Sequence, residues 1–352
     1  MQAPLPTEGL PANAGTTIML LHKGYPNNPA EALQHLASHF QESGVPQILT
    51  SSMAELYWKK YSTDLHHCID NSQSYPSFED TLTHVSTNLQ SILANFTPEF
   101  GPFRVHFTSL DTSFEDSITD IIKNGTDSLF LVSLYPLYNK RTGSMLSRIN
   151  DVLQKQTKTK DYPSEDIART SHVSSKFPTT FDCTRLVNIG AMSQIVHYFA
   201  EKILLRIEDC GADSVIFAVP LPDIRISKAY CEQVTSISQR IVYSLLERSL
   251  KSVDWRVAFY KSWEQLPSTQ KYPTIHDQVK HLRKYGNQTT LILPLLELFP
   301  GFDTETTLPK LVFDHEDLVL VQPITDDKAL LHSIADMIKS ELLTISQIRS
   351  YD

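Results

Sequence analysis

Short apolar runs alternate with helical patterns along this chain, and that alternation limits its fold more than any other feature. The runs at 17–21, 128–134, 214–219 and 290–295 have the length and composition of buried strands. Between them, apolar residues recur every three or four positions, as they do in amphipathic helices. Strands that alternate with helices form parallel sheets that are covered on both faces. We therefore predict an α/β fold with two similar Rossmann-like domains, each built on a parallel sheet, and a cleft between them.

The predicted elements fall into two series separated by the polar segment 154–180. This segment is the best candidate for a domain boundary. We expect a flexible N-terminal lead-in at 1–16, an N-terminal α/β domain at 17–165, and a C-terminal α/β domain at 166–352 that ends in a helix. The expected strands are 17–21, 104–107, 128–134, 214–219, 255–260, 290–295 and 318–321, and the expected helices are 29–43, 77–95, 114–124, 182–209, 229–249, 275–285 and 327–348.

Charge and composition exclude several classes of protein. The net charge is -9 and the lysines and arginines are scattered, which argues against a nucleic-acid partner. No apolar run approaches the roughly 20 residues that a transmembrane helix needs. The cysteines lie far apart without a CxxC pair, so we interpret them as reduced thiols rather than as ligands of a metal cluster.

Two carboxylates follow the buried run at 290–295, where ligands bind in open α/β sheets. Asp303 and Glu305 lie in the segment Phe299–Leu308, which we predict to be a loop. An alternative is that the pair caps the next turn or faces solvent. The loop after the run at 214–219, by contrast, has no side chain that can accept a proton.

Four segments in a fixed order carry a resemblance that covers nearly the whole chain. They are Ile18–Pro26, Ser133–Asn139 with Thr142–Ser144, Leu221–Pro222 with Tyr230, and Phe299–Leu308. In this order they resemble ferrochelatase, the class II chelatase that inserts ferrous iron into a porphyrin. The resemblance implies a chelatase-like fold, a porphyrin or haem as ligand and ferrous iron as metal.

The resembling segments lack the family's catalytic histidine. The histidine of the family motif SAHxLP falls on Val219 when the segment is aligned from Pro222, and on Pro220 when it is aligned from Phe217. Metallation removes two protons from pyrrole nitrogens, and a neutral imidazole suits that task because its pKa lies near working pH. Neither Val219 nor Pro220 can replace it.

Other family positions are also changed. The family's Arg-Tyr pair falls on Thr108 and Ser109, and its Asp-His pair falls on Phe302 and Asp303. Only Glu305 matches the family's acidic residue directly. If the chain is active, Glu305 and Asp303 are the candidates for proton transfer, with Glu305 also a weak candidate for metal binding.

The resemblance also yields candidate porphyrin-binding residues. A histidine in the first ligand-facing loop can ligate haem iron, tyrosines can line a cleft, and basic residues can meet propionates. The alternatives are ordinary packing for the aromatic residues and solvated loop charges for the basic ones. The candidates are His22, Tyr135, Tyr138, Lys140, Arg141 and Ser144.

Three functions are compatible with the sequence. The first is a ferrochelatase-like protein that is catalytically impaired and serves as a porphyrin- or haem-binding or structural subunit. The second is an active, divergent ferrochelatase. The third is a purely structural subunit in a larger mitochondrial assembly with protein partners. We favour the first, because the missing groups are the chemically demanding ones.

The resemblance implies the mitochondrial matrix, or the matrix side of the inner membrane, for a eukaryotic chain and the cytoplasm otherwise.

Overall fold

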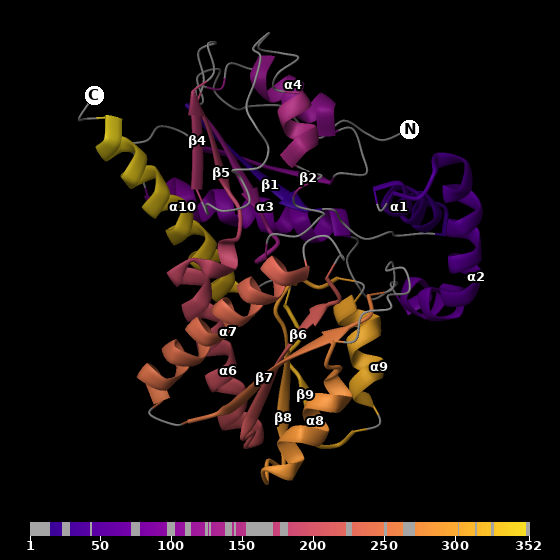
Figure 1. Cartoon of the computed structure of the whole chain (residues 1–352). Coiled ribbons are helices and arrows are strands. Elements are labelled where there is room, and N and C mark those ends of the chain that lie inside the picture. Colours follow the sequence, from indigo (N-terminus) through magenta and orange to yellow (C-terminus); the bar gives the residue numbers. More distant parts are fainter. Residues whose placement is uncertain are drawn as a thin grey trace.

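The computed structural model consists of two α/β halves, each with its own sheet (Figure 1). No helix in the part of the chain that is described is long and apolar enough to cross a membrane. The structure describes residues 15–22, 29–42, 44–71, 78–96, 103–109, 114–123, 126, 128–137, 143, 146–152, 172–176, 182–222, 227–249, 252–262, 272–301, 303–313, 315–324 and 327–349.

The first sheet has five strands in the order β2-β1-β3-β5-β4. Four of them run parallel, and only the edge strand β4 is antiparallel to its neighbour β5. The interior strand β1 is buried along its whole length, in keeping with its apolar run Ile18–Leu21. The strands are β1 (Thr16–His22), β2 (Phe103–Ser109), β3 (Ser128–Ser133), β4 (His172–Lys176) and β5 (Asp182–Leu186).

The second sheet has four parallel strands in the order β7-β6-β8-β9. Its central strands β6 and β8 are buried throughout. Because all four strands run the same way, their carboxyl ends lie along one edge, where the following loops gather. The strands are β6 (Ser214–Pro220), β7 (Asp254–Tyr260), β8 (Thr290–Pro294) and β9 (Leu318–Leu320).

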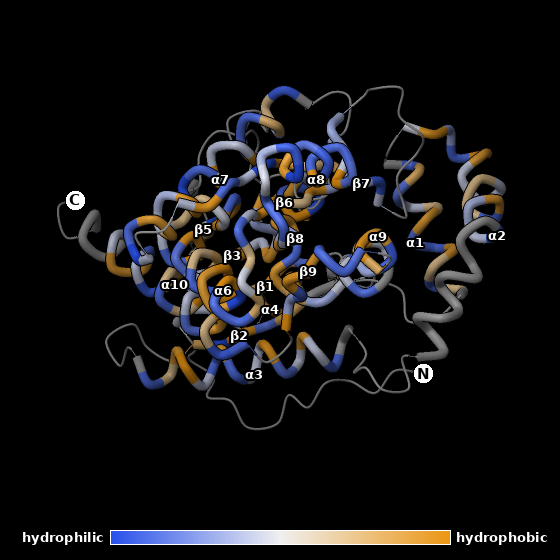
Figure 2. Tube along the Cα trace, turned by 90° about the horizontal axis from the view of Figure 1, so that it is seen from below, coloured by the Kyte–Doolittle hydropathy of each residue, from blue (hydrophilic) through white to orange (hydrophobic). Residues whose placement is uncertain are grey.

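Helices surround both sheets, and along them hydrophilic and hydrophobic residues alternate, as expected for helices with one buried face (Figure 2). The long helix α10 packs against α3 of the first half and α6 of the second. The helices are α1 (Pro29–Glu42), α2 (Gln47–Asn71), α3 (Phe78–Phe96), α4 (Phe114–Lys123), α6 (Ser193–Cys210), α7 (Ser227–Ser249), α8 (Ile275–Lys284), α9 (Leu308–Phe313) and α10 (Lys328–Arg349), with shorter turns η4 (Ile189–Ala191) and η5 (Asp303–Thr307).

One hydrophobic core extends through both halves. It includes Ile18 and Leu20 of the first sheet, Phe217 and Leu293 of the second, and Ile334 of α10. Buried apolar area is the main stabilising contribution in folding, at roughly 25 cal/mol per Å². Because the two sheets share this core, it holds their strands in a fixed relation to each other.

The predicted α/β alternation is confirmed, and each expected strand is present with ends shifted by one or two residues. The helix expected at 182–209 is wrong at its start. Residues 182–186 form strand β5 because they pair with β3, and α6 begins only at Ser193. It ends as expected at Gly211, whose φ of 67° is a left-handed conformation that glycine adopts at little cost. The helices α2 and α9 were not predicted.

The first sheet extends beyond residue 165, where we placed the end of the N-terminal domain. Both β4 and β5 belong to it. The polar segment 154–180 therefore contains β4 and precedes β5, and it does not separate the two sheets. The expected lead-in at 1–16 lies outside the described residues up to position 14, and Thr16 already belongs to β1.

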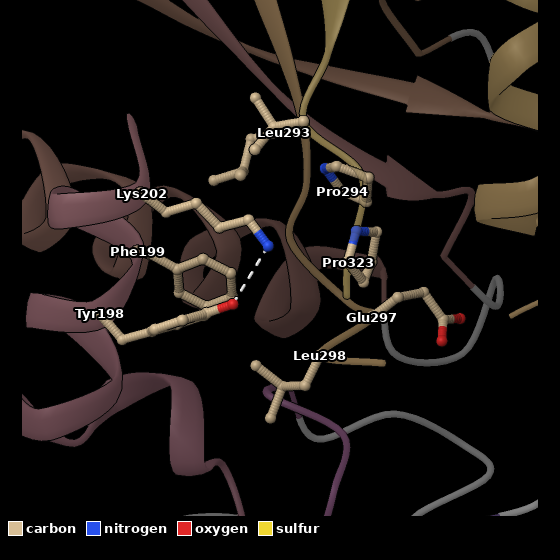
Figure 3. Close-up of a pocket in the computed structure, with 9 residues that line it drawn as sticks. Tyr198, Phe199, Lys202, Leu293, Pro294, Glu297, Leu298 and Pro323 are labelled. Carbon is tan, nitrogen blue, oxygen red and sulfur yellow. Dashed lines mark hydrogen bonds between the residues drawn. The ribbon is translucent and has the colours of Figure 1, made fainter. Parts of the chain in front are cut away.

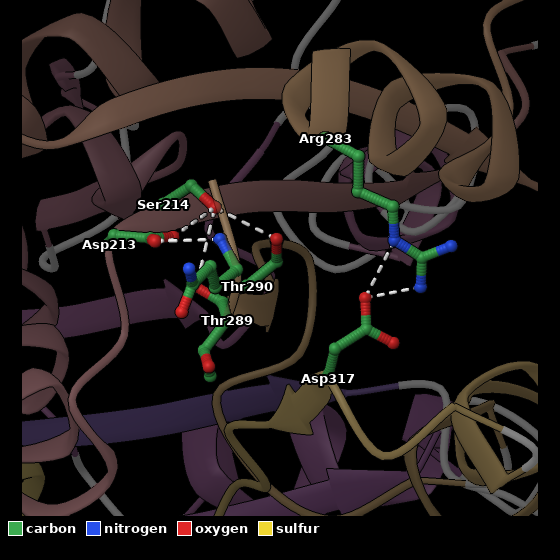
Figure 4. A network of polar contacts seen from close by, with 7 residues as sticks. Asp213, Ser214, Arg283, Thr289, Thr290 and Asp317 are labelled. Carbon is green, nitrogen blue, oxygen red and sulfur yellow. Dashed lines mark hydrogen bonds and ion pairs between the residues drawn. The ribbon is translucent and has the colours of Figure 1, made fainter. Parts of the chain in front are cut away.

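Buried hydroxyl groups join the amino ends of two central strands in the second sheet (Figure 4). The Oγ of Ser214 and the Oγ1 of Thr290 are 2.8 Å apart, and both side chains are buried. Next to them, the carboxylate of Asp213 accepts a hydrogen bond from the backbone N–H of Gln288 at 2.7 Å. This polar cluster fixes the register of β6 against β8 at the edge opposite the ligand-facing loops.

We expect Ser214→Ala to lower the free energy of unfolding by about 1–3 kcal/mol, because it leaves the buried Thr290 hydroxyl without its partner. The double variant with Thr290→Val removes both hydroxyls, so its cost should be clearly smaller than the sum of the two single changes. Urea denaturation of the four proteins measures this difference. Single effects that simply add would contradict the proposed pairing.

Candidate functional site

The carboxyl ends of the two sheets meet at a histidine and a glutamate. His22 is the last residue of β1, and Glu297 follows β8. The Nε2 atom of His22 lies 4.0 Å from Oε2 of Glu297, and each side chain is only 6% exposed. An imidazole from the first half therefore faces a carboxylate from the second half in a site that excludes most water.

Tyr135 holds the imidazole from one side. Its ring stacks on that of His22, with centroids 4.6 Å apart and planes at 17°. The loop after β3 is itself fixed, since the carbonyl of Pro136 accepts the backbone N–H of Gly190 at 2.9 Å. A Cβ atom on Gly190 would come within 2.8 Å of that carbonyl oxygen, so glycine is required for this close approach. The orientation of His22 thus depends on loops that follow β3 and β5.

A glycine also leaves room for the carboxylate of Glu297. A Cβ atom on Gly301 would lie 3.1 Å from its Oε2 atom. The backbone N–H of Gly301 donates to the hydroxyl of Thr304 at 2.8 Å, and the N–H of Glu305 donates to the Gly301 carbonyl at 3.0 Å. These bonds tie the segment after β8 to the turn η5.

The segment with the predicted carboxylates is not a loop. Residues Asp303–Thr307 form a π-helical turn, and α9 follows directly. Turns of this kind are rare and occur frequently at functional sites. The chain folds this way here because Asp303 is buried and accepts hydrogen bonds from Ser262 at 2.5 Å and from Thr307 at 2.8 Å. Asp303 therefore joins the segment after β7 to η5 through side-chain hydrogen bonds.

Glu305 has a different environment on the same turn. Its side chain is half-buried, and this burial raises its pKa because desolvation disfavours the charged form. A carboxyl group with a raised pKa can hold or release a proton closer to neutral pH. The two carboxyl groups of this turn therefore differ, since burial raises the pKa of Glu305 whereas Asp303 accepts two hydrogen bonds.

Four positions that align with changed family residues lie at the ends of strands β6 and β2. Val219 and Pro220 are the last residues of β6, are fully packed, and pair with Phe259 and Tyr260 of β7. No proton acceptor occupies the end of β6 itself. Thr108 and Ser109 end β2 beside Leu21 and His22. Four of the predicted binding residues, namely Tyr138, Lys140, Arg141 and Ser144, lie outside the described residues.

A small pocket adjoins Glu297, with a cavity volume of about 10 Å³, roughly the space of one water molecule. It lies between α6 and the segments that follow β8 and β9, and the carboxylate of Glu297 points away from its polar wall (Figure 3). Lys202 donates to the hydroxyl of Tyr198 at 3.1 Å, and Tyr198 donates to Oδ2 of Asp327 at 2.8 Å. Burial lowers the pKa of Lys202 and raises the pKa of Tyr198, which therefore stays protonated and donates. The lining residues are Tyr198, Phe199, Lys202, Leu293, Pro294, Glu297, Leu298, Val321 and Pro323.

The sequence analysis missed Glu297 and Lys202. A signal for Glu297 was present, because it is the one charged residue within the apolar run 291–299. Charged residues are almost never fully buried unless they are paired, so an acid in such a run indicates a partner. Lys202 gave no such signal, since lysines are common on amphipathic helices.

Metal binding by the protein alone is limited in the described part of the chain. No group of three or more His, Cys, Asp or Glu side chains there is arranged to hold a metal ion. His22 and Glu297 together offer one imidazole and one carboxylate. A metal ion at this pair would therefore need further ligands beyond these two side chains.

Comparisons with known proteins give remote similarities to solved structures. SirB from Bacillus subtilis with Fe3+ is 14% identical over 92% of this chain and 94% of its own, with a TM-score of 0.47. A multi-domain protein from Deinococcus radiodurans with structural similarity to chelatases is 11% identical over 92% of this chain and 54% of its own, with a TM-score of 0.46. The sirohydrochlorin chelatase SirB from Bacillus subtilis subspecies spizizenii in complex with cobalt is 13% identical over 91% of this chain and 92% of its own, with a TM-score of 0.40.

No protein-family model and no curated protein matches the chain. At identities and TM-scores this low, the function has to be argued from the residues of this chain.

The raised pKa of Glu305 predicts a pH-dependent effect on stability. The Glu305 carboxyl group binds its proton more tightly in the folded chain than in the unfolded chain. Protonation of Glu305 therefore stabilises the fold fully below the usual glutamate pKa of about 4.3. This stabilisation is lost as the pH rises through the raised pKa of the folded chain. Glu305→Gln removes the cost of burying the charge. We expect the variant to gain stability relative to the parent between about pH 4 and pH 7.

Urea denaturation at several pH values measures this gain, with Glu316→Gln as the control because Glu316 is exposed. A difference between the variant and the parent that is the same at every pH would show that Glu305 ionises as it does in the unfolded chain.

Proposed function

We propose that this chain is a tetrapyrrole chelatase in which His22 and Glu297 accept the protons that leave the macrocycle as a divalent metal ion enters. The observation that carries the proposal is the buried imidazole–carboxylate pair at the junction of the two sheets. It supplies the nitrogen base that the end of β6 lacks. The ordered resemblance of four segments to ferrochelatase supports a porphyrin as the substrate and ferrous iron as the metal.

The chemistry requires two proton acceptors. A free porphyrin loses two N–H protons when M²⁺ binds its four nitrogens, so the products are the metalloporphyrin and two protons. The neutral imidazole of His22 can accept one proton at Nε2, and the carboxylate of Glu297 attracts the imidazolium that forms. Glu297 can accept the second proton. Imidazole nitrogen and carboxylate oxygen also suit ferrous iron as temporary ligands before transfer.

Tyr135 is a positioning residue in this proposal. Its ring lies flat against that of His22 and limits the directions in which the imidazole can turn. Since general acid–base catalysis requires the base within hydrogen-bond reach of its proton, a fixed ring lowers the cost of reaching that geometry.

A second candidate is a non-catalytic porphyrin- or haem-binding subunit. The packed Val219 and Pro220 favour it, as does Asp303, whose carboxylate oxygens accept hydrogen bonds from Ser262 and Thr307. In this case His22 would ligate haem iron instead of accepting protons.

Anaerobic turnover of a free-acid porphyrin with ferrous iron, followed by the loss of porphyrin fluorescence, tests the proposal. We expect His22→Ala and Glu297→Gln each to lower the rate by about 10²–10⁴, the usual contribution of a general base. His332→Ala, on the exposed face of α10, is the matched control and should retain the parental rate.

The same proteins separate the two candidates. A folded parent that binds haem through His22 but never inserts metal would support the subunit and contradict the chelatase. A parent that binds neither porphyrin nor haem would contradict both.

A further inference from the structure

Two imidazole rings lie next to each other outside the candidate site. His276 is an exposed residue in the first turn of α8, and His315 is half-buried in the turn between α9 and β9. Their ring centroids are 6.4 Å apart, and the ring planes make an angle of 43°. Apart from this ring contact, neither side chain has a hydrogen bond or an ion pair within the part of the chain that the structure describes. Both imidazoles can therefore accept a ligand from solvent.

Local hydrogen bonds fix the backbone at both histidines. At the start of α8, the hydroxyl oxygen of Thr274 accepts the N–H of Asp277 at 3.2 Å, and the N–H of Thr274 donates to the Asp277 carboxylate at 3.0 Å. This reciprocal pair is a capping box, which sets the first turn of the helix. In the turn before β9, the N–H of His315 donates to the carbonyl of Val312 at 3.0 Å, and the carbonyl of His315 accepts the N–H of Leu318 at 3.2 Å.

Tertiary contacts join the two elements that carry the histidines. Arg283 of α8 donates from Nε to Oδ2 of Asp317 at 2.8 Å (Figure 4). Ile275 of α8 and Leu318 of β9 belong to one hydrophobic cluster on the second sheet. The backbone positions of the two histidines are therefore fixed relative to each other by packing and by an ion pair.

Carboxylates accompany both imidazoles. The pKa of Asp277 is lowered, chiefly by the hydrogen bond from the backbone of the N-cap residue, and the pKa of Asp317 is lowered, chiefly by the hydrogen bond from Arg283. Both groups are therefore negatively charged at neutral pH. Glu316 is exposed next to His315 and adds a third carboxylate, whereas Lys280 and Arg283 of α8 supply positive charge. Among these five charged side chains the negative ones are in the majority, which favours a bound cation.

We propose that His276 and His315 together bind a divalent transition-metal ion such as Zn²⁺, with water completing its coordination. Imidazole nitrogen suits Zn²⁺, Cu²⁺ and Ni²⁺. Two imidazoles on a tetrahedral Zn²⁺ ion have ring centres roughly 5 Å apart, because each Zn–N bond is about 2.0–2.1 Å long. The separation of 6.4 Å exceeds this by only about 1 Å, which rotation of the exposed His276 side chain can close.

The number of protein ligands indicates a reversible site. Structural zinc sites usually have four protein ligands. No group of three or more His, Cys, Asp or Glu side chains is arranged around a metal position in the described residues, so His276 and His315 are the two ligands there. The site shares no residue with the His22–Glu297 pair and does not depend on the proposed function.

Calorimetric titration of the whole chain with zinc chloride near neutral pH tests the site. His276→Ala and His315→Ala should each weaken Zn²⁺ binding by at least about tenfold, since even groups that only orient a metal ligand contribute about 10–100-fold to affinity. The double variant should lose little more than either single variant, because the two ligands act as one unit. His197→Ala is the matched control, since His197 is an exposed histidine on α6, and it should retain the parental affinity.

A second measurement uses the parent chain and does not depend on the stability of a variant. Zn²⁺ should shift the imidazole NMR signals of His276 and His315 over the same range of Zn²⁺ concentration. Each signal is identified by its absence in His276→Asn or His315→Asn. His22→Ala should leave both shifts unchanged, which distinguishes this site from the candidate pair.

Three results would each overturn the proposal. The first is a parent chain that does not bind Zn²⁺. The second is a loss of affinity in only one of the two single variants, which would leave the other imidazole as an ordinary packing residue. The third is a pair of imidazole signals that move at different Zn²⁺ concentrations, which would show that the two rings do not share an ion.

Discussion

The hydrophobic core that the two sheets share determines the geometry of the candidate site. Strands β1 and β8 belong to different sheets, yet Leu20 and Leu293 lie in one buried cluster. Because the strands within each sheet are parallel, their following loops gather at the carboxyl edges, and the core holds those edges against each other. The 4.0 Å approach of His22 to Glu297 therefore depends on the packing of two halves of the chain and not on a single loop. Helix α10 contributes to the same arrangement, since it contacts α3 and α6.

Three acidic residues near the carboxyl edge of the second sheet have three different surroundings, and these surroundings divide their roles. Asp303 is buried and accepts hydrogen bonds from two hydroxyl groups, so its charge is satisfied within the fold. Glu297 is buried opposite the imidazole of His22, with 4.0 Å between its Oε2 atom and Nε2 of the ring. Glu305 is half-buried, and desolvation raises its pKa. Pairs of titratable groups whose environments differ in this way are typical of sites that transfer protons.

The sequence predicted the fold well because hydrophobic periodicity is a local property. The buried strands β1 and β6 contain short apolar runs, and Gly211 marks the end of α6. The errors occurred where tertiary contacts decide the structure. Residues 182–186 have no strong strand pattern and become β5 by pairing with β3. The turn η5 depends on the hydrogen bond from Ser262, which is about forty residues away in sequence and unrecognisable in it. Helix α2 has exposed apolar residues such as Ile48 and Leu56, so it lacks a clear amphipathic pattern.

The dependence on tertiary contacts also explains why the sequence argument about a proton-accepting side chain was incomplete. Val219 and Pro220, on which the resemblance places the family's histidine, occupy the end of β6. The sequence argument looked for the base at the end of β6 and for the acid at Glu305. A proton acceptor is defined by its position relative to the substrate, and a cleft has two walls, so either half can supply it. His22 was singled out only as a ligand for haem iron, since nothing in a linear sequence connects it to Glu297 some 275 positions later. The contact exists because β1 and β8 are both central strands whose carboxyl ends lie at the junction of the two sheets.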